Sequence, residues 1–254
     1  MWNPSKISAS SFSVFKRGSG YLKTGIQDPA AAVYFAIHGR EKLARHQTTR
    51  LLRSLDIEAR DVYKYYDLST IELVSLEKHL SDVFGKYFSG RGISRGGGFD
   101  LYVILRLLQP ERIVETGVEG GLSSAYILQA LENNNKGTLY SIDYPIEPAV
   151  IKKGSGFAIP DSLKERWILK IGKSSDVLNK LLSELDRIDI FLHDSEHTYE
   201  NMMFEFSAVW DRLPEKGVLL SHDVSLNRAF YDFAKKIERK PIILYSWNLG
   251  IIIK

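Results

Sequence analysis

The chain has 254 residues, of which 44% are apolar and 26% are charged, with a net charge of +3 and no cysteine. This length allows one large core, or one core with a smaller appendage. The lack of cysteine excludes disulfides, thiolate metal ligands and cysteine nucleophiles. No stretch reaches the ~18 consecutive apolar residues that a membrane helix needs. We see no signal peptide at the N-terminus and expect a cytoplasmic protein without a membrane span.

The first 90 residues are expected to form a basic, largely helical N-terminal extension. Residues 1–60 hold ten Lys or Arg against four Asp or Glu. Apolar residues recur at helical spacing in 29–55 and again in 69–88, where Ser69 or Thr70 is the expected N-cap. Contacts with substrate, contacts between subunits of a homo-oligomer and a merely solvated arm remain open alternatives for this extension.

A glycine run at 96–98 interrupts the helical pattern and marks a flexible join or a close approach of backbone to ligand. We place the domain boundary near residue 90. The stretch RGGGFD, residues 95–100, is a candidate lid over the site.

Residues 91–254 alternate between helical and strand patterns. The expected helices are 99–109, 122–134, 174–185, 199–213 and 226–238, and the expected strands are 112–117, 138–145, 167–173, 188–194, 217–223, 241–246 and 249–254. Such alternation predicts an α/β fold, a Rossmann-like, doubly wound, mostly parallel sheet of seven strands. Only Trp247 and Asn248 separate the last two strands, which predicts a closing antiparallel hairpin.

The turn after the first strand reads ETGVEGGLS, an E-x-G-x-x-x-G-x-S pattern. Ligands of doubly wound sheets bind beyond the carboxyl ends of the strands, so this turn is a candidate site. Gly117 and Gly121 permit a tight turn and close approach of a ligand. Glu115 would repel a pyrophosphate and attract an ammonium group, so we expect a ligand with a positive amine.

Asp143 ends the second strand, about twenty residues past the glycines, where an acid is placed to accept both hydroxyls of a ribose. A ligand that carries both an amine and a ribose points to S-adenosylmethionine. The alternative for Asp143 is a helix cap or a turn residue.

At this point residues 91–254 resemble the class I S-adenosylmethionine-dependent methyltransferases. The resemblance implies that Glu115, Gly117, Gly121 and Ser123 surround the methionine part and that Asp143 binds the ribose. It also implies that the turn IGKSSDVL contacts adenine. The cofactor-binding residues expected from it are Glu115, Gly117, Gly121, Ser123, Asp143, Gly172, Lys173, Ser174 and Asp194.

Two further stretches, HDSEHTYE and EKGVLLSHDV, resemble motifs of one branch of that family. The branch contains O-methyltransferases that act on macrolide and aminocoumarin sugars, and cephalosporin-hydroxylase-like proteins. Several members hold a divalent metal such as Mg²⁺ with an aspartate after strand four and two acids after strand five. The matching positions here are Asp194, His222 and Asp223, and the histidine departs from the acidic pattern.

Methyl transfer to oxygen requires that the acceptor hydroxyl lose a proton, to a base or through a metal. His197 and Glu196 are the candidate bases, and Asp194 is the third candidate catalytic residue. Other interpretations are weaker: His193 and His197 lack the H-E-x-x-H pattern of a zinc pair, and no G-x-S-x-G elbow supports a hydrolase. Asp194 and His197 could also simply cap the following helix.

The sequence therefore favours a methyltransferase that modifies the oxygen of a small hydroxylated acceptor, with a sugar or natural product as the candidate class. The alternatives are an S-adenosylmethionine-binding module without transfer activity and a hydroxylase-like enzyme on the same fold. No nucleic-acid partner is expected, because the part of the chain after residue 60 is slightly acidic.

Overall fold

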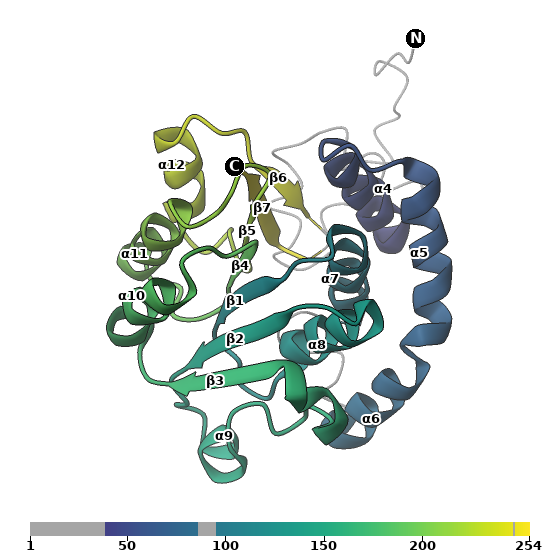
Figure 1. Cartoon of the computed structure of the whole chain (residues 1–254), viewed down its shortest axis with the longest axis horizontal. Helices are drawn as coiled ribbons and strands as arrows, with labels where there is room; N and C mark the ends of the chain where they lie inside the picture. The colour runs from purple at the N-terminus through teal and green to yellow at the C-terminus, as the bar shows by residue number, and fades with distance from the viewer. Residues whose placement is uncertain (1–38, 86–94, 246) are drawn as a thin grey trace, which may run out of the picture.

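The computed structural model describes residues 39–85, 95–245 and 247–254. Its strands form one sheet in the order β3-β2-β1-β4-β5-β7-β6, and β7 runs antiparallel to both of its neighbours (Figure 1). The strands are β1 Arg112–Thr116, β2 Thr138–Asp143, β3 Trp167–Ile171, β4 Ile190–His193, β5 Val218–Ser221, β6 Ile242–Leu244 and β7 Leu249–Ile253. The predicted seven-stranded fold with a closing hairpin is confirmed.

Helices cover both faces of the sheet (Figure 1). One face carries α7 Arg95–Leu108 and α8 Leu122–Asn134, with α4 Arg40–Arg53, α5 Ala59–Glu72 and α6 Val74–Phe84 packed around them. The other face carries α10 Ser174–Leu185, α11 Tyr199–Trp210 and α12 Ala229–Lys236. The connection from β2 to β3 holds α9 Pro148–Lys153 and the 3₁₀ helix η3 Asp161–Arg166. Helices α8 and α10 begin and end at the predicted residues.

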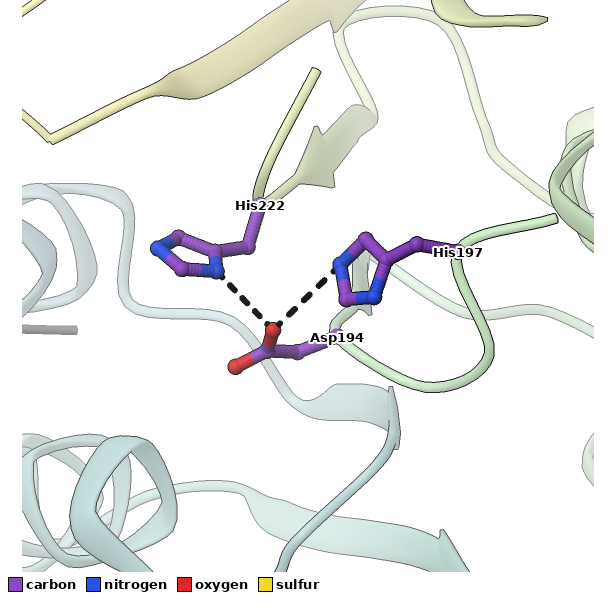
Figure 2. A group of neighbouring side chains, drawn as sticks. All are labelled: Asp194, His197 and His222. Carbon is purple, nitrogen blue, oxygen red and sulfur yellow. Dashed lines mark hydrogen bonds and ion pairs between the residues drawn. The ribbon is translucent and has the colours of Figure 1, made fainter. Parts of the chain in front are cut away.

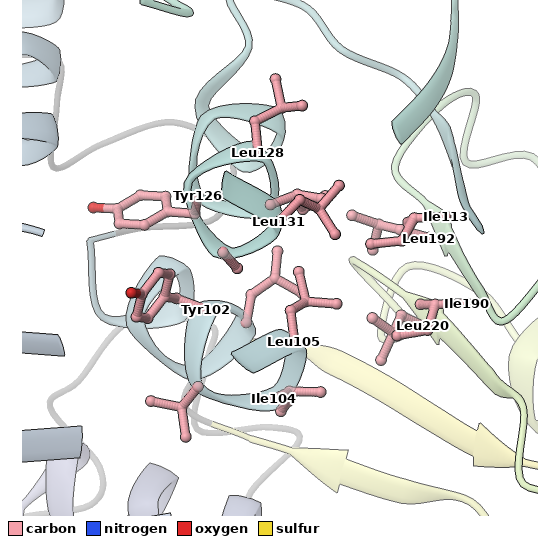
Figure 3. Packing of buried hydrophobic residues seen from close by; sticks show 14 of the residues in the cluster. Tyr102, Ile104, Leu105, Ile113, Tyr126, Leu128, Leu131, Ile190, Leu192 and Leu220 are labelled. Atoms are coloured by element: carbon pink, nitrogen blue, oxygen red, sulfur yellow. The ribbon is translucent and has the colours of Figure 1, made fainter. Parts of the chain in front are cut away.

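The central strands are buried on both faces, as their continuous apolar runs predict. Successive side chains alternate between two hydrophobic clusters: Ile113 packs with α7 and α8, and Val114 packs on the opposite side. Figure 3 shows Ile113 and Leu192 facing Leu131 of α8. Because apolar clusters pack on both faces of the sheet, the strands are held in place. They therefore support the loops at their carboxyl ends.

The helix expected over 69–88 is wrong in its start and its continuity. The structure has two helices, α5 and α6, which meet at Leu73. Ser69 lies inside α5, and its Oγ donates to the carbonyl oxygen of Tyr66 at 2.7 Å rather than capping a helix. The buried residues Val62, Tyr66 and Ser69 lie on one face of α5. This buried face begins before the predicted start of the helix at Ser69. Residues 86–88 lie outside the described part of the chain.

The stretch RGGGFD is the first turn of α7 and not a separate lid. A Cβ on Gly98 would lie 2.3 Å from Cε2 of Tyr126, so glycine lets α7 approach α8 closely here. Gly98 therefore serves helix packing. The expected break in the helical pattern over 89–100 is wrong from Arg95 onward, because α7 runs through the glycine run, and residues 89–94 lie outside the described part of the chain.

Helices α4 to α6 share the hydrophobic core of the sheet. Leu51, Leu52, Leu73 and Leu80 are fully buried in the same cluster as Ile190. The basic segment 1–38 lies outside the described residues. In the part of the chain that is described, no helix combines the length and the apolar character needed to cross a bilayer.

Candidate active site

The loops after β1, β2, β4 and β5 are laid side by side by backbone hydrogen bonds that continue beyond the strands. The amide of Gly117 donates to the carbonyl of Ile142 at 2.9 Å, and that of Asp194 donates to the carbonyl of Thr116 at 2.8 Å. The amide of His222 donates to the carbonyl of His193, also at 2.9 Å. The candidate residues after these four strands therefore gather at one edge of the sheet.

Asp143 stands at the end of β2 and is only 7% exposed. Its Oδ1 accepts from the amide of Val118 at 3.0 Å and more weakly from that of Glu119 at 3.4 Å. Its Oδ2 accepts from the hydroxyl of Ser155, in the segment that follows α9. The carboxylate is thus fixed by the glycine turn, and it already receives one hydroxyl donor.

The glycine turn needs its glycines at the two predicted positions. Gly117 and Gly121 have φ of 84° and 89°, which favour glycine. A Cβ on Gly117 would lie 2.0 Å from the carbonyl oxygen of Asp194. A Cβ on Gly121 would lie 2.7 Å from Ile159. The turn is therefore pressed between the loop after β4 and the segment that leads to η3.

Glu115 lies behind the turn and is fully buried. Its Oε1 accepts from Ser123 Oγ at 2.7 Å, and its Oε2 accepts from Ser124 Oγ at 2.6 Å and Ser141 Oγ at 3.0 Å. Burial raises the pKa of Glu115 to about 7, although the three serines oppose the shift. Both carboxylate oxygens of Glu115 already accept hydrogen bonds from serines. In this structure they are therefore not available for the ammonium group that the sequence analysis expected at Glu115.

The turn after β3 carries the three residues expected near adenine. Gly172 has φ of 153°, and Lys173 is the N-cap residue of α10, with its Nζ 5.5 Å from the centre of the Tyr144 ring. Ser174 is buried, and its Oγ donates to Asn201 Oδ1 of α11 at 3.0 Å. Lys173 therefore lies toward the end of β2, whereas the hydroxyl of Ser174 is turned to α11.

Asp194, His197 and His222 form a cluster beside the turn (Figure 2). Nδ1 of His222 lies 3.0 Å from Oδ1 of Asp194, and Nε2 of His197 lies 3.7 Å from the same oxygen. Nε2 of His197 is buried and has no hydrogen-bond partner among the described residues. Within the described residues, Nε2 of His197 therefore lies near a carboxylate without making a hydrogen bond.

The pKa values of the two histidines in the cluster are shifted in opposite directions. Burial lowers the pKa of His197 and the neighbouring His193 lowers it further, which outweighs the carboxylates of Asp194 and Asp223. Burial also opposes charge on His222, but Asp194 and Asp223 raise its pKa to about 9. Near neutral pH, His197 is therefore neutral and His222 is a cation paired with Asp194.

Two predicted site residues, Glu196 and Asp223, are not part of the convergent group, although Asp223 borders it. Glu196 is exposed, and in the described part of the chain its Oε1 accepts one hydrogen bond, from Thr198 at 3.3 Å. Asp223 approaches His222 Nδ1 at 3.5 Å through Oδ2, while its Oδ1 accepts from Asn248 Nδ2 at 2.9 Å. Neither lies in the group whose nitrogen and oxygen atoms converge within 4.8 Å.

Sequence reasoning missed several residues that shape the site, above all Glu205 and Ser155. Glu205 is an acid on the buried side of α11, next to Phe206, so a charge at an apolar helical position was the available signal. Ser155 carries no comparable signal, because nothing in a loop sequence shows which carboxylate its hydroxyl meets.

A cavity of about 360 Å³ lies at the opposite edge of the sheet, with Pro110, Asp189 and Gly217 in its lining. It borders the amino ends of the strands, where doubly wound sheets do not place their ligands. The candidate site therefore rests on the side chains at the carboxyl edge.

Residues 114–224 match the sequence model of a family described as "Methyltransferase domain", a range that begins in β1 and ends just after β5. A search of curated proteins finds no match.

Solved structures share the fold at low sequence identity. An O-methyltransferase from Bacillus cereus in complex with SAH is 12% identical, with a TM-score of 0.53, over 76% of this chain and 100% of that one. TomG from Streptomyces achromogenes, an O-methyltransferase involved in tomaymycin synthesis and solved with SAM, is 16% identical, with a TM-score of 0.52, over 77% and 96%. An SAH-bound methyltransferase from Podospora anserina is 16% identical, with a TM-score of 0.53, over 72% and 87%.

Proposed function

We propose that the chain is a class I methyltransferase that transfers the methyl group of S-adenosylmethionine to a hydroxyl oxygen of a small molecule. Support comes from the match of residues 114–224 to a methyltransferase domain and from the shared fold. The observation that carries the proposal is the carboxyl edge of the sheet. There Asp143 and the glycine turn stand beside a cluster with one neutral and one charged histidine. A bare binding module has no need for such a cluster, so we favour an enzyme.

Asp143 is the residue best placed to hold the ribose. The amide of Val118 fixes its Oδ1, and the hydroxyl of Ser155 occupies its Oδ2 in the way a ribose hydroxyl would. The carboxylate of Asp143 therefore offers an acceptor oxygen that fits a ribose hydroxyl in the place of Ser155. Gly117 and Gly121 shape the turn against which the methionine part would lie, and Glu115 supports that turn from behind through Ser123. The turn with Gly172 and Lys173 borders the place of the adenine.

S-adenosylmethionine supplies a methyl group on a positive sulfur. In an in-line displacement the acceptor oxygen bonds to the methyl carbon, the carbon–sulfur bond breaks, and its electron pair stays on sulfur. The hydroxyl proton goes to Nε2 of His197, which makes no hydrogen bond within the described part of the chain. Asp194 lies 3.7 Å from that nitrogen and stabilises the imidazolium that forms.

The residues of the cluster do not fit the Mg²⁺ expected from the family resemblance. Mg²⁺ requires oxygen ligands in near-octahedral geometry, whereas the atoms that converge here are one carboxylate oxygen and two imidazole nitrogens. The expected third ligand, Asp223, faces His222 and Asn248. We therefore assign proton transfer to His197, and the proposed mechanism uses no metal ion.

The acceptor is proposed as a small hydroxylated molecule, with a sugar or a natural product as the class to test first. Support comes from the family motifs in HDSEHTYE and from the fold shared with TomG. In this proposal Glu196, exposed at the rim, is a candidate for acceptor contacts rather than the base.

The test measures release of S-adenosylhomocysteine from S-adenosylmethionine with a panel of hydroxylated sugars and phenols. We expect acceptor-dependent release by the wild type. His197→Asn should lower kcat by about 10²- to 10⁴-fold, the usual contribution of a general base, with little change in cofactor binding. His46→Asn, on the exposed side of α4, is the matched control. Undiminished transfer by His197→Asn would refute the assignment of the base.

A further inference from the structure

Glu205 is a buried carboxylate for which the mechanism above has no use. It lies on α11 with no exposed surface, between Met202 and Phe206 on the apolar side of the helix. An ionised carboxylate in such a place is costly unless hydrogen bonds satisfy it. Its partners therefore indicate what it is for.

Four side chains donate to Glu205, two to each oxygen. Ser195 Oγ at 2.7 Å and Asn201 Nδ2 at 3.0 Å meet Oε1, and Thr116 Oγ1 and His193 Nδ1, both at 2.7 Å, meet Oε2. Burial alone would raise the pKa of Glu205, but the hydrogen bond and charge of His193, and after them the hydroxyl of Thr116, lower it, so the carboxylate is ionised at neutral pH.

These donors come from the parts of the chain that carry the site. Thr116 ends β1 and leads into the glycine turn, and His193 and Ser195 flank Asp194 in the chain. The backbone of the same loop is held as well, since Asn201 Nδ2 also donates to the carbonyl oxygen of Glu196 at 3.0 Å. Glu205 thus fixes the loop on both sides of Asp194 and ties it to the end of β1.

Glu205 is linked to His197 indirectly, through His193. The two imidazole rings meet edge to face with their centres 5.0 Å apart, and Nδ1 of His193 is held by Glu205. A 1 Å displacement of a catalytic group can lower a rate by about 100-fold, so a fixed His193 has a consequence for catalysis.

We propose that Glu205 is a positioning residue for methyl transfer, which holds the loop of Asp194 and His197 in register with the glycine turn. It touches neither the acceptor nor the reacting atoms and acts through His193, Ser195 and Thr116. This inference rests on the proposed function, because it assumes that His197 takes the proton.

A double-mutant cycle separates this role from plain structural support. Glu205→Gln keeps the size of the side chain but puts an amide where two donors need an acceptor. We expect kcat to fall at least tenfold and the Kd for S-adenosylmethionine to stay within threefold. In a His197→Asn background, Glu205→Gln should change kcat less than twofold, because the group that it positions is gone.

The same fall in both backgrounds, or no fall in either, would overturn the proposal. Glu200→Gln, an exposed acid on the same helix, is the matched control and should leave kcat unchanged. If Glu205→Gln does not fold, Ser195→Ala and Thr116→Val each remove one donor and take its place in the cycle.

A second readout needs no acceptor and keeps the inference separate from the proposed function. Long-range ¹H–¹⁵N spectra of the imidazoles report the surroundings of His193, His197 and His222. In folded Glu205→Gln we expect the signals of His193 and His197 to shift, with those of His46 unchanged. Unshifted His197 signals would overturn the proposal, even if no methyl transfer is found for the wild type.

Discussion

Burial of single acids decides much of the electrostatics of this site. Glu115 and Glu205 are both fully buried, but their pKa values move in opposite directions. Glu115 receives hydrogen bonds from three neutral hydroxyls, which do not compensate for its burial, whereas Glu205 also has His193 as a donor. The type of donor therefore determines which acid holds its proton near neutral pH.

Glu115 should give the protein a measurable loss of stability as pH rises. Its pKa is about 7 in the folded state and about 4.5 when exposed, so the folded state holds the extra proton between these values. Stability should therefore fall from about pH 4.5 to pH 7 and level off above, by on the order of 3 kcal/mol from this group. Glu115→Gln has no proton to lose and should remove that slope.

Urea denaturation at pH 5 and pH 8 checks this expectation. From pH 5 to pH 8, the wild type should lose unfolding free energy that Glu115→Gln keeps, so the difference between the two should change in favour of the variant. Exposed Glu200→Gln should follow the wild type. Parallel changes in all three proteins would show that Glu115 titrates normally.

The residue scale also shows where sequence reasoning ends. The position of Asp143 after a strand, and of Asp194 after another, predicted that both lie at the carboxyl edge, and they do. The convergence of Asp194, His197 and His222 within 4.8 Å was only partly foreseen, since Asp223 stood in place of His197. Rotamers and loop paths decide such sets, and strand order alone does not fix them.

Among the elements, the connection from β2 to β3 has the most direct effect on the site. After α9 it crosses the glycine turn, with the amides of Gly156 and Ala158 donating to the carbonyls of Glu119 and Gly120 at 2.9 and 3.0 Å. This path brings the hydroxyl of Ser155 onto Asp143. A ribose that binds Asp143 must therefore exchange with Ser155.

Removal of that hydroxyl should tighten cofactor binding. Ser155→Ala leaves Oδ2 of Asp143 open, so the ribose no longer competes with an internal hydrogen bond, and we expect a Kd for S-adenosylmethionine that is about 3- to 10-fold lower. Ser183→Ala, exposed on α10, is the control. Weaker binding by Ser155→Ala in calorimetric titration would mean that Ser155 helps to hold the ligand instead.

Periodicity was a good guide to elements with one strong apolar stripe and a poor guide elsewhere. Helix α10 has five buried residues at helical spacing and was placed correctly from Ser174 to Leu185. Helix α5 buries only Val62, Tyr66 and Ser69 among the residues of its stripe, and the sequence analysis missed its first ten residues. The antiparallel hairpin was predictable because two strand patterns flank a two-residue connection.

For the whole molecule, the N-terminal helices and the sheet form one packing unit. Tyr66 and Trp247 donate to the buried carboxylate of Asp100, which joins α5, α7 and the hairpin connection. Burial raises the pKa of Asp100 to about 6 in spite of these donors. The glycine run and the change of pattern predicted a boundary near residue 90, but they cannot show that apolar residues of α4 to α6 complete the core.

A chain that starts at Arg95 should therefore not fold by itself. It would expose the side of α7 that α4 and α5 cover, including Leu101 and Tyr102, which are buried in the full chain. We expect a broad thermal transition and strong binding of a hydrophobic dye, against a sharp transition for the full chain. A cooperative transition in the truncated chain would make residues 95–254 an independent domain.

Calorimetric titration with S-adenosylmethionine and S-adenosylhomocysteine tests the central claim most directly. We predict binding of the wild type with a Kd on the order of micromolar. Asp143→Ala should weaken it at least tenfold by loss of the charge-assisted hydrogen bonds to the ribose, while Asp211→Ala, at the exposed end of α11, leaves it unchanged. No binding by the folded wild type, or equal binding by Asp143→Ala, would contradict the placement of the cofactor at this edge of the sheet.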